Sequence, residues 1–151
     1  MRVIQGILRA AAVFALTAPA SASPCPQSVT QAVLKAHAGA LVNACKQETE
    51  DGKIQYEVKI TLTDGKRAEL DVDPEGKILL TEEYVDLAAV PPAVMSAFAA
   101  KFPGAKATKA EKQTSADGKM TYELAFGTGA AKKEATFTAD GALVEEERGQ
   151  D

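Results

Sequence analysis

The sequence repeats one short segment, and this internal repetition limits the fold more than any other feature. Residues 51–58 (DGKIQYEV) return 66 positions later as residues 117–124 (DGKMTYEL). Residues 73–79 (DPEGKIL) match residues 138–144 (TADGALV) in the same way, at an offset of 65. Repetition of this kind indicates a duplicated supersecondary unit. We therefore predict two tandem copies of one small module.

Each copy begins with a helical pattern. Apolar residues recur at helical spacing in both copies, at Val29, Val33 and Leu41, with Leu34 beside them, and at Val90, Val94, Phe98 and Phe102. His37, the only histidine, shares the first stripe and corresponds to Phe98 in the second copy. We interpret His37 as a partly buried packing residue, because the equivalent position accepts phenylalanine.

Alternation of apolar and polar residues follows each helix and predicts antiparallel strands. Ile54, Tyr56, Val58, Ile60 and Leu62 share one side, and Met120, Tyr122, Leu124 and Phe126 repeat the pattern. Asp-Gly and Glu-Gly pairs between the runs predict tight turns. The predicted fold class is α+β, a tandem repeat of a helix followed by a four-stranded antiparallel meander, with the helix packed on one sheet face. The predicted copies are residues 23–86 and 87–151.

Polar side chains on the other side of these strands form the candidate binding surface. They are mostly acidic, and they are Gln55, Glu57, Lys59, Glu69, Asp71, Thr121, Glu123 and Glu134. The chain has no tryptophan, and the alternation directs Tyr56 and Tyr122 toward the core. The surface therefore lacks the aromatic anchors of tight interfaces. It favours a partner that is attracted by charge.

The N-terminus has the three parts of a secretory signal peptide. Arg2 and Arg9 are basic, an apolar stretch follows, and Ala20-Ser21-Ala22 offers a cleavage site with small residues. We predict that residues 1–22 are the signal peptide and that the mature chain is periplasmic or secreted. No later stretch is apolar enough to predict a membrane span.

The mature chain is acidic. Removal of Arg2 and Arg9 leaves 15 of the 17 basic residues against 21 acidic ones, a net charge of −6. Such a surface repels phosphate groups, so the charge argues against nucleic acid as a partner.

Cys25 and Cys45 are the only cysteines of the chain. In an oxidising compartment they predict a disulfide. Lipid attachment at Cys25 is the alternative, and Pro24 argues against it because a lipoprotein signal has a small residue immediately before its cysteine.

One segment matches the spacing of a calcium-binding loop. Asp71, Asp73, Glu75 and Glu82 supply oxygens at the required positions, with Gly76 at the sixth. The alternation that precedes the segment is typical of a strand, whereas a calcium loop follows a helix. We therefore prefer a strand and a Glu-Gly turn, and keep a periplasmic calcium-binding protein as the alternative function.

The sequence contains no recognisable catalytic motif. A glycine-rich phosphate loop, a nucleophile elbow and a zinc-binding His-Glu-x-x-His helix are all missing from it. We therefore predict a protein that is not an enzyme, with no catalytic residues, no metal and no cofactor.

Several short motifs resemble those of the PepSY-like family, whose members are also described as similar to β-lactamase-inhibitor proteins. They are 90–94 (VPPAV), 102–105 (FPGA), 117–124 and 140–143 (DGAL) in the second copy, and 51–58 and 72–79 (VDPEGKIL) in the first. The resemblance implies a secreted or periplasmic module in which a helix packs on an antiparallel sheet. It also implies a non-enzymatic role, such as inhibition of an extracytoplasmic enzyme, for example a peptidase. The expected partner is thus an unidentified extracytoplasmic protein.

Overall fold

The computed structural model describes residues 25–148, so the predicted signal peptide at 1–22 lies outside the described residues. The elements are α1 (Gln27–Ala36), β1 (Leu41–Glu50), β2 (Lys53–Thr61), β3 (Arg67–Val72), β4 (Ile78–Val85), the 3₁₀ turn η1 (Leu87–Ala89), α2 (Pro92–Lys101), β5 (Ala107–Ser115), β6 (Met120–Phe126), the 3₁₀ turn η2 (Gly129–Ala131), β7 (Lys133–Thr138) and β8 (Leu143–Arg148). Neither α-helix within this range has the length or the apolar character that a membrane span requires.

The strands form one antiparallel sheet in the order β1 to β8, and this corrects the predicted fold class. We expected two tandem repeats, each a helix followed by a four-stranded meander, that either pack on each other or share a continuous sheet. In the described residues β4 pairs with β5 along a ladder that runs from Leu80–Ser115 to Val85–Ala110, so the chain is a small α+β fold with a single sheet and not two repeat units. The physical reason is that backbone pairing between β4 and β5 leaves no sheet edge between the two halves.

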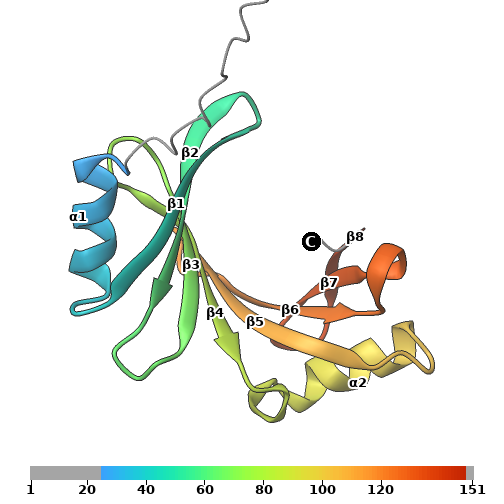
Figure 1. The fold of residues 1–151 in the computed structure, drawn as a ribbon. Helices are drawn as coiled ribbons and strands as arrows, with labels where there is room; N and C mark the ends of the chain where they lie inside the picture. Colours follow the sequence, from blue (N-terminus) through green and yellow to red (C-terminus); the bar gives the residue numbers. More distant parts are fainter. Residues whose placement is uncertain (1–24, 149–151) are drawn as a thin grey trace, which may run out of the picture.

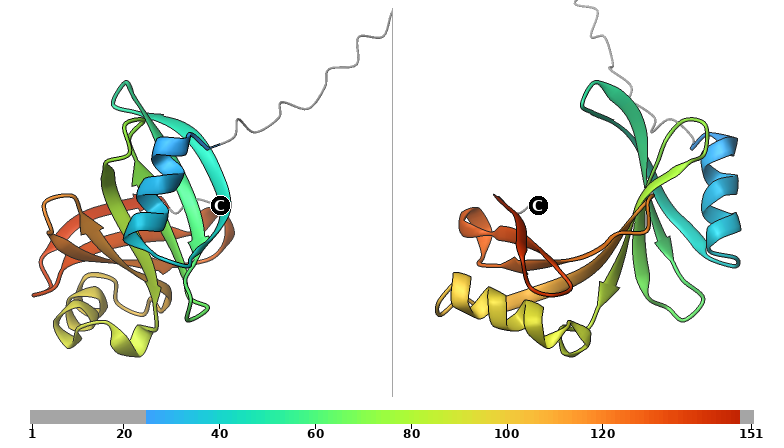
Figure 2. Two further views of the ribbon diagram at one scale, coloured as in Figure 1. Left: turned by 90° about the vertical axis from the view of Figure 1, so that its left-hand side faces the viewer. Right: turned by 180° about the vertical axis from the view of Figure 1, so that it is seen from behind.

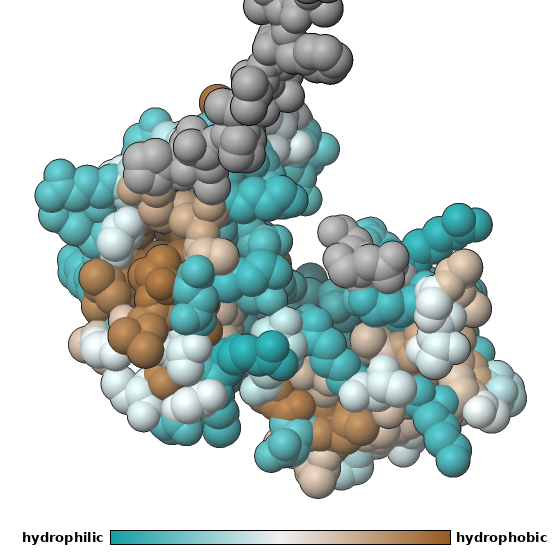
Figure 3. Space-filling view, viewed as in Figure 1, coloured by the Kyte–Doolittle hydropathy of each residue, from teal (hydrophilic) through white to brown (hydrophobic). Residues whose placement is uncertain are grey.

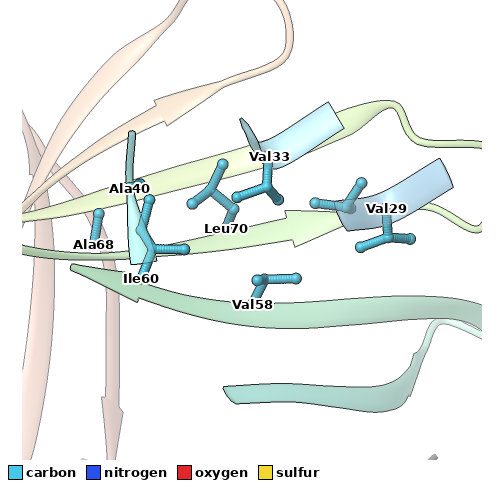
Figure 4. Close-up of a cluster of buried hydrophobic side chains, with 8 residues drawn as sticks. Val29, Val33, Ala40, Val58, Ile60, Ala68 and Leu70 are labelled. Atoms are coloured by element: carbon cyan, nitrogen blue, oxygen red, sulfur yellow. The ribbon is translucent and has the colours of Figure 1, made fainter. Parts of the chain in front are cut away.

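Both helices pack on the convex face of this curved sheet (Figures 1 and 2). Val29 and Val33 of α1 lie against a buried cluster on β2 and β3 that includes Val58, Ile60 and Leu70 (Figure 4). Burial of such side chains stabilises the fold by roughly 1.5 to 3 kcal/mol each.

The second cluster lies under α2. Val94 and Phe98 pack with residues of β5, β6 and β7, among them Leu124, Phe126 and Phe137. The rings of Phe98 and Phe126 meet edge to face with their centroids 5.1 Å apart, a favoured aromatic geometry.

Helix α1 ends earlier than the apolar stripe suggested. It stops at Ala36, and Leu41 begins β1 with an exposed side chain. His37 caps the helix and is half-buried. Gly39 has a φ of +80° in the turn to β1, a left-handed conformation that favours glycine and breaks the helical period.

The predicted inward side of β2 and β6 is confirmed at the two tyrosines but is wrong at the ends of these strands. Tyr56 and Tyr122 are half-buried against the two clusters. Ile54 and Met120 have the same phase but are 47% and 51% exposed, because they lie beside the hairpin turns, where β2 and β6 begin.

A disulfide joins Cys25 to Cys45. It ties the segment just before α1 to the middle of β1, with the two Cα atoms 5.5 Å apart and a sequence separation of 20. Both cysteines pack against the cluster under α1. The cross-link therefore holds α1 on the convex face.

Two turn glycines approach the helices closely. Gly76 and Gly141 both have a φ of +92°, and a Cβ atom there would lie 2.9 Å from the Ser28 carbonyl oxygen and 2.7 Å from the Ala93 carbonyl oxygen, respectively. The Ser28 hydroxyl also donates a hydrogen bond of 2.7 Å to the Pro74 carbonyl. The β3–β4 and β7–β8 turns therefore contact the first turns of α1 and α2.

We expect Gly141→Ala to destabilise the protein by about 1 to 3 kcal/mol more than Gly118→Ala, measured by urea unfolding. Both positions have positive φ, so both variants carry the same left-handed strain. Only Gly141 faces backbone atoms, since a Cβ on Gly118 meets nothing within 4 Å. Equal losses of stability would contradict the proposed contact between turn and helix.

Replacing both cysteines with serine should lower the free energy of unfolding by about 3 kcal/mol, because the cross-link restricts a loop of this length in the unfolded chain. Urea unfolding of the two proteins without reductant measures the difference. Adding reductant should destabilise only the wild type. Two free thiols in the non-reduced protein, seen by mass spectrometry, would contradict the disulfide.

Candidate functional site: an acidic groove

The concave face of the sheet is left open by both helices and curves into a groove of about 790 Å³. Side chains from all eight strands line it, and they include eleven carboxyl groups and four lysines. Figure 3 shows hydrophilic side chains around the hollow between the two ends of the sheet. We call this surface the acidic groove.

All eight predicted binding residues line the acidic groove. Gln55, Glu57, Lys59, Glu69, Asp71, Thr121, Glu123 and Glu134 come from β2, β3, β6 and β7. Alternation brings them together, because residues two apart on a strand share a face. Their role in binding stays a prediction.

The predicted binding surface did not include the middle of the groove, and Glu82 was considered only as a calcium ligand. β4 and β5 contribute Glu82, Tyr84, Lys109, Glu111 and Gln113. The sequence pattern that would reveal them is weak, because only one of the residues that alternate with them on β5, Ala110, is apolar and buried. The period of two between Lys109, Glu111 and Gln113 is the feature that could have revealed them.

The amide of Gln113 bridges two carboxyl groups on the floor of the groove. Its nitrogen donates hydrogen bonds of 2.9 Å to Glu82 and 3.0 Å to Glu123. Its oxygen accepts a 2.9 Å hydrogen bond from the hydroxyl of Thr121. The bridge holds the carboxyl groups of β4 and β6 at fixed positions on either side of β5.

Burial and neighbouring carboxylates raise the pKa values of the groove acids. Burial, opposed by the Gln113 hydrogen bond and aided by Glu111, raises the pKa of Glu82 to about 7. Burial together with Glu134 and Glu111 raises the pKa of Glu123 to about 8. Burial and the acids of β1 and β2 raise the pKa of Asp71 to about 6. The floor of the groove therefore holds protons near neutral pH.

Like charges face each other directly across the strands. Glu69 lies opposite Glu82, and Glu111 lies opposite Glu123. Two further acidic pairs are Glu57 with Asp71, between β2 and β3, and Glu134 with Glu147, between β7 and β8. Directly opposed like charges destabilise a sheet, so stability alone does not explain this arrangement.

Tyr84 is the aromatic residue of the groove. Its hydroxyl donates a 2.8 Å hydrogen bond to Glu69, and the Lys109 ammonium lies 4.5 Å from the centre of its ring. The Arg67 guanidinium lies 4.8 Å from the same centre. Lys109 also pairs at 3.0 Å with Glu111, whose side chain is 6% exposed. Burial lowers the pKa of Lys109, but Glu111 outweighs burial and raises it.

The four residues of the predicted calcium loop are not gathered into a site. Asp71 and Glu82 lie on β3 and β4, whereas Asp73 and Glu75 belong to the turn between these strands. The Asp73 carboxylate accepts a 2.8 Å hydrogen bond from the backbone of Lys77, which closes that turn. Within residues 25–148 no group of three or more acidic, histidine or cysteine side chains could hold a metal. The segment is a hairpin.

We expect the free energy of unfolding to fall as the pH rises from about 5 to about 8. In the folded protein Glu82 and Glu123 keep their protons up to pKa values of about 7 and about 8, against an ordinary value of 4.5. Above pH 4.5 the unfolded chain therefore binds fewer protons than the folded protein, so linkage makes stability fall as the pH rises. Urea unfolding at several pH values measures this slope.

The variant Glu82→Gln/Glu123→Gln should flatten the slope, because it removes both titrating groups and keeps an acceptor for Gln113. The control Glu75→Gln removes an exposed carboxyl in the β3–β4 turn and should keep the slope. A wild-type stability that stays level or rises over this range would contradict the assignment.

Neither a family model nor a curated protein sequence matches the chain. Several solved structures share its fold. A BLIP-like protein from Bacteroides fragilis is 22% identical with a TM-score of 0.64, and the match covers 85% of this chain and 91% of that one. A DUF2874 family protein from Bacteroides uniformis is 19% identical with a TM-score of 0.66, covering 81% and 88%. A protein provisionally assigned to the periplasm of Bacteroides eggerthii is 19% identical with a TM-score of 0.66, and the match covers 81% of this chain and 87% of that one. The chain therefore has a BLIP-like fold.

Proposed function

We propose that the chain is an exported, non-enzymatic binding or inhibitory module, and that the acidic groove is its binding surface. One observation carries this proposal. Both helices and both hydrophobic clusters occupy the convex side, so an eight-stranded face of ordered polar side chains is left open and concave. Binding sites are usually concave, and positioned polar groups give them their specificity.

Export is supported by two features of the chain. Residues 1–22 have the pattern of a secretory signal peptide, and the disulfide between Cys25 and Cys45 suits an oxidising compartment. The provisional periplasmic assignment of a protein with the same fold agrees with this localisation.

A binding role is supported by the fold and by the resemblance to the PepSY-like family. A BLIP-like protein from Bacteroides fragilis has a similar fold, with a TM-score of 0.64, and we assign this chain to the inhibitor-like class that the family resemblance implies. An extracytoplasmic enzyme such as a peptidase is the target class that the resemblance implies.

The polar side chains of the groove bind one another. Its lysines pair with carboxylates, as Lys59 does with Glu57 and Glu69 at 3.3 and 3.1 Å. Gln113 holds the carboxyl groups of Glu82 and Glu123 in place by hydrogen bonds. These features support recognition by charge and hydrogen bonding.

Affinity capture from a periplasmic extract tests the proposal. The immobilised mature protein should retain a partner that Glu145→Lys/Glu147→Lys fails to retain, because both residues line the groove on exposed positions of β8. The control Glu75→Lys/Asp86→Lys makes the same charge change at exposed positions outside the groove and should retain the partner. A partner held equally by wild type and groove variant would contradict the proposed surface.

A further inference from the structure

We propose that the acidic groove receives a lysine- and arginine-rich segment of the partner protein, and that docking of this segment expels the protons from Glu82 and Glu123. The inference rests on the proposed function, because it names the chemistry of the partner and a pH dependence for the same surface. It follows from the charge, the shape and the hydrogen bonding of the groove.

The positive charges within the groove are already engaged. Lys46 pairs with Glu48 at 2.7 Å, Lys59 with Glu57 and Glu69, Lys109 with Glu111, and Lys132 with Glu134 at 3.9 Å. The eleven carboxyl groups of the groove outnumber its four lysines by seven. The groove therefore has a surplus of acidic groups, which bound protons or an external cation can neutralise.

Part of this surplus lies on the floor, and the rest lies on β1 and β8 at the two ends of the sheet. Among the described residues, no lysine or arginine lies within 4.0 Å of the carboxyl groups of Asp71, Glu82 or Glu123. The charged and titratable groups that face Glu82 and Glu123 are Lys59 from β2, Glu69 and Asp71 from β3, Tyr84 from β4, Lys109 and Glu111 from β5, Glu134 from β7 and Glu145 from β8. Lys59 and Lys109 are held by Glu69 and Glu111. The two bridged carboxyl groups thus lack a cation of their own.

The arrangement suits an extended chain better than a single ion. The carboxyl groups come from all eight strands, and within the described residues they form no cluster that could hold a metal. Carboxyl groups two residues apart on one strand lie about 7 Å apart, which matches alternate side chains of an extended peptide. Leu80 and Val144 are the only aliphatic side chains among the lining residues, so the groove does not favour an apolar segment.

Protonation gives this docking a measurable signature. At pH 7 Glu123, with a pKa of about 8, is mostly protonated, and Glu82, with a pKa of about 7, is half protonated. A guanidinium or ammonium group placed beside them favours the ionised forms and lowers both pKa values. The protons pass to the buffer, and Gln113 continues to donate to both carboxylates.

Titration calorimetry with an octa-arginine peptide tests the inference. At pH 7 and low salt we expect saturable binding, and comparison of phosphate with Tris buffer should show release of about one proton or more per complex. At pH 9 the proton release should vanish, because both carboxyl groups are already ionised. Binding should weaken steeply as salt is added.

The variant Glu82→Gln/Glu123→Gln should bind octa-arginine about tenfold more weakly and release no protons, since two charges at the centre of the contact are lost. The variant Glu75→Gln/Asp86→Asn removes the same number of carboxyl groups at exposed positions outside the groove and should behave as wild type. Equal weakening in both variants, binding without saturation, or binding to wild type without proton release would overturn the inference.

Failure of the inference and failure of the proposed function are distinguishable. If the captured partner still depends on Glu145 and Glu147 while octa-arginine does not bind, the inference fails and the binding role stands. If partner capture is independent of the groove variants, the proposed function itself fails.

Discussion

The placement of both helices on the same face of the sheet is the constraint on which the rest of the structure depends. Val29 and Val33 of α1, and Val94 and Phe98 of α2, bury one side of the sheet in two hydrophobic clusters. An antiparallel sheet covered on one face can present a polar surface on the other. Pairing of β4 with β5 joins the two halves, so this polar surface extends without interruption across eight strands.

The two faces contribute to the free energy of folding in opposite senses. The convex face supplies apolar burial, the disulfide and close contacts between turn glycines and helices. The concave face carries directly opposed carboxyl groups, such as Glu69 with Glu82 and Glu111 with Glu123, that weaken the folded state at neutral pH. Sites at which local stability rules are broken are often functional, and this is why the acidic groove is the strongest candidate surface on the molecule.

The sequence predicted which face of a strand each side chain occupies better than it predicted how the strands pair into one sheet. Alternation on β2 and β6 was strong enough to orient Tyr56 and Tyr122 toward the core and Glu57 and Glu123 toward the opposite face. Ile54 and Met120 follow the same phase but lie beyond the buried clusters, because a periodic pattern does not report where a helix stops covering a strand.

The centre of the sheet could not be predicted in the same way. Pairing of β4 with β5 joins residues separated by η1 and α2, and backbone hydrogen bonds of this kind leave no local pattern in the sequence. Strand β5 is poor in large apolar residues, and in β4 such residues gather at the two ends of the strand, so Tyr84 and Gln113 had no strong alternation around them. Curvature of the sheet, which turns a row of polar residues into a groove, is a property of all eight strands together.

Carboxyl footprinting of the captured complex tests the central claim, that the concave face is the binding surface. Carbodiimide labelling of the free and the bound protein compares the accessibility of each acid by mass spectrometry. The account predicts that the partner protects Glu57, Glu69 and Glu145 in the groove and leaves Glu75 and Asp86 outside it unchanged. Protection of Glu75 and Asp86 with unchanged labelling in the groove would contradict it.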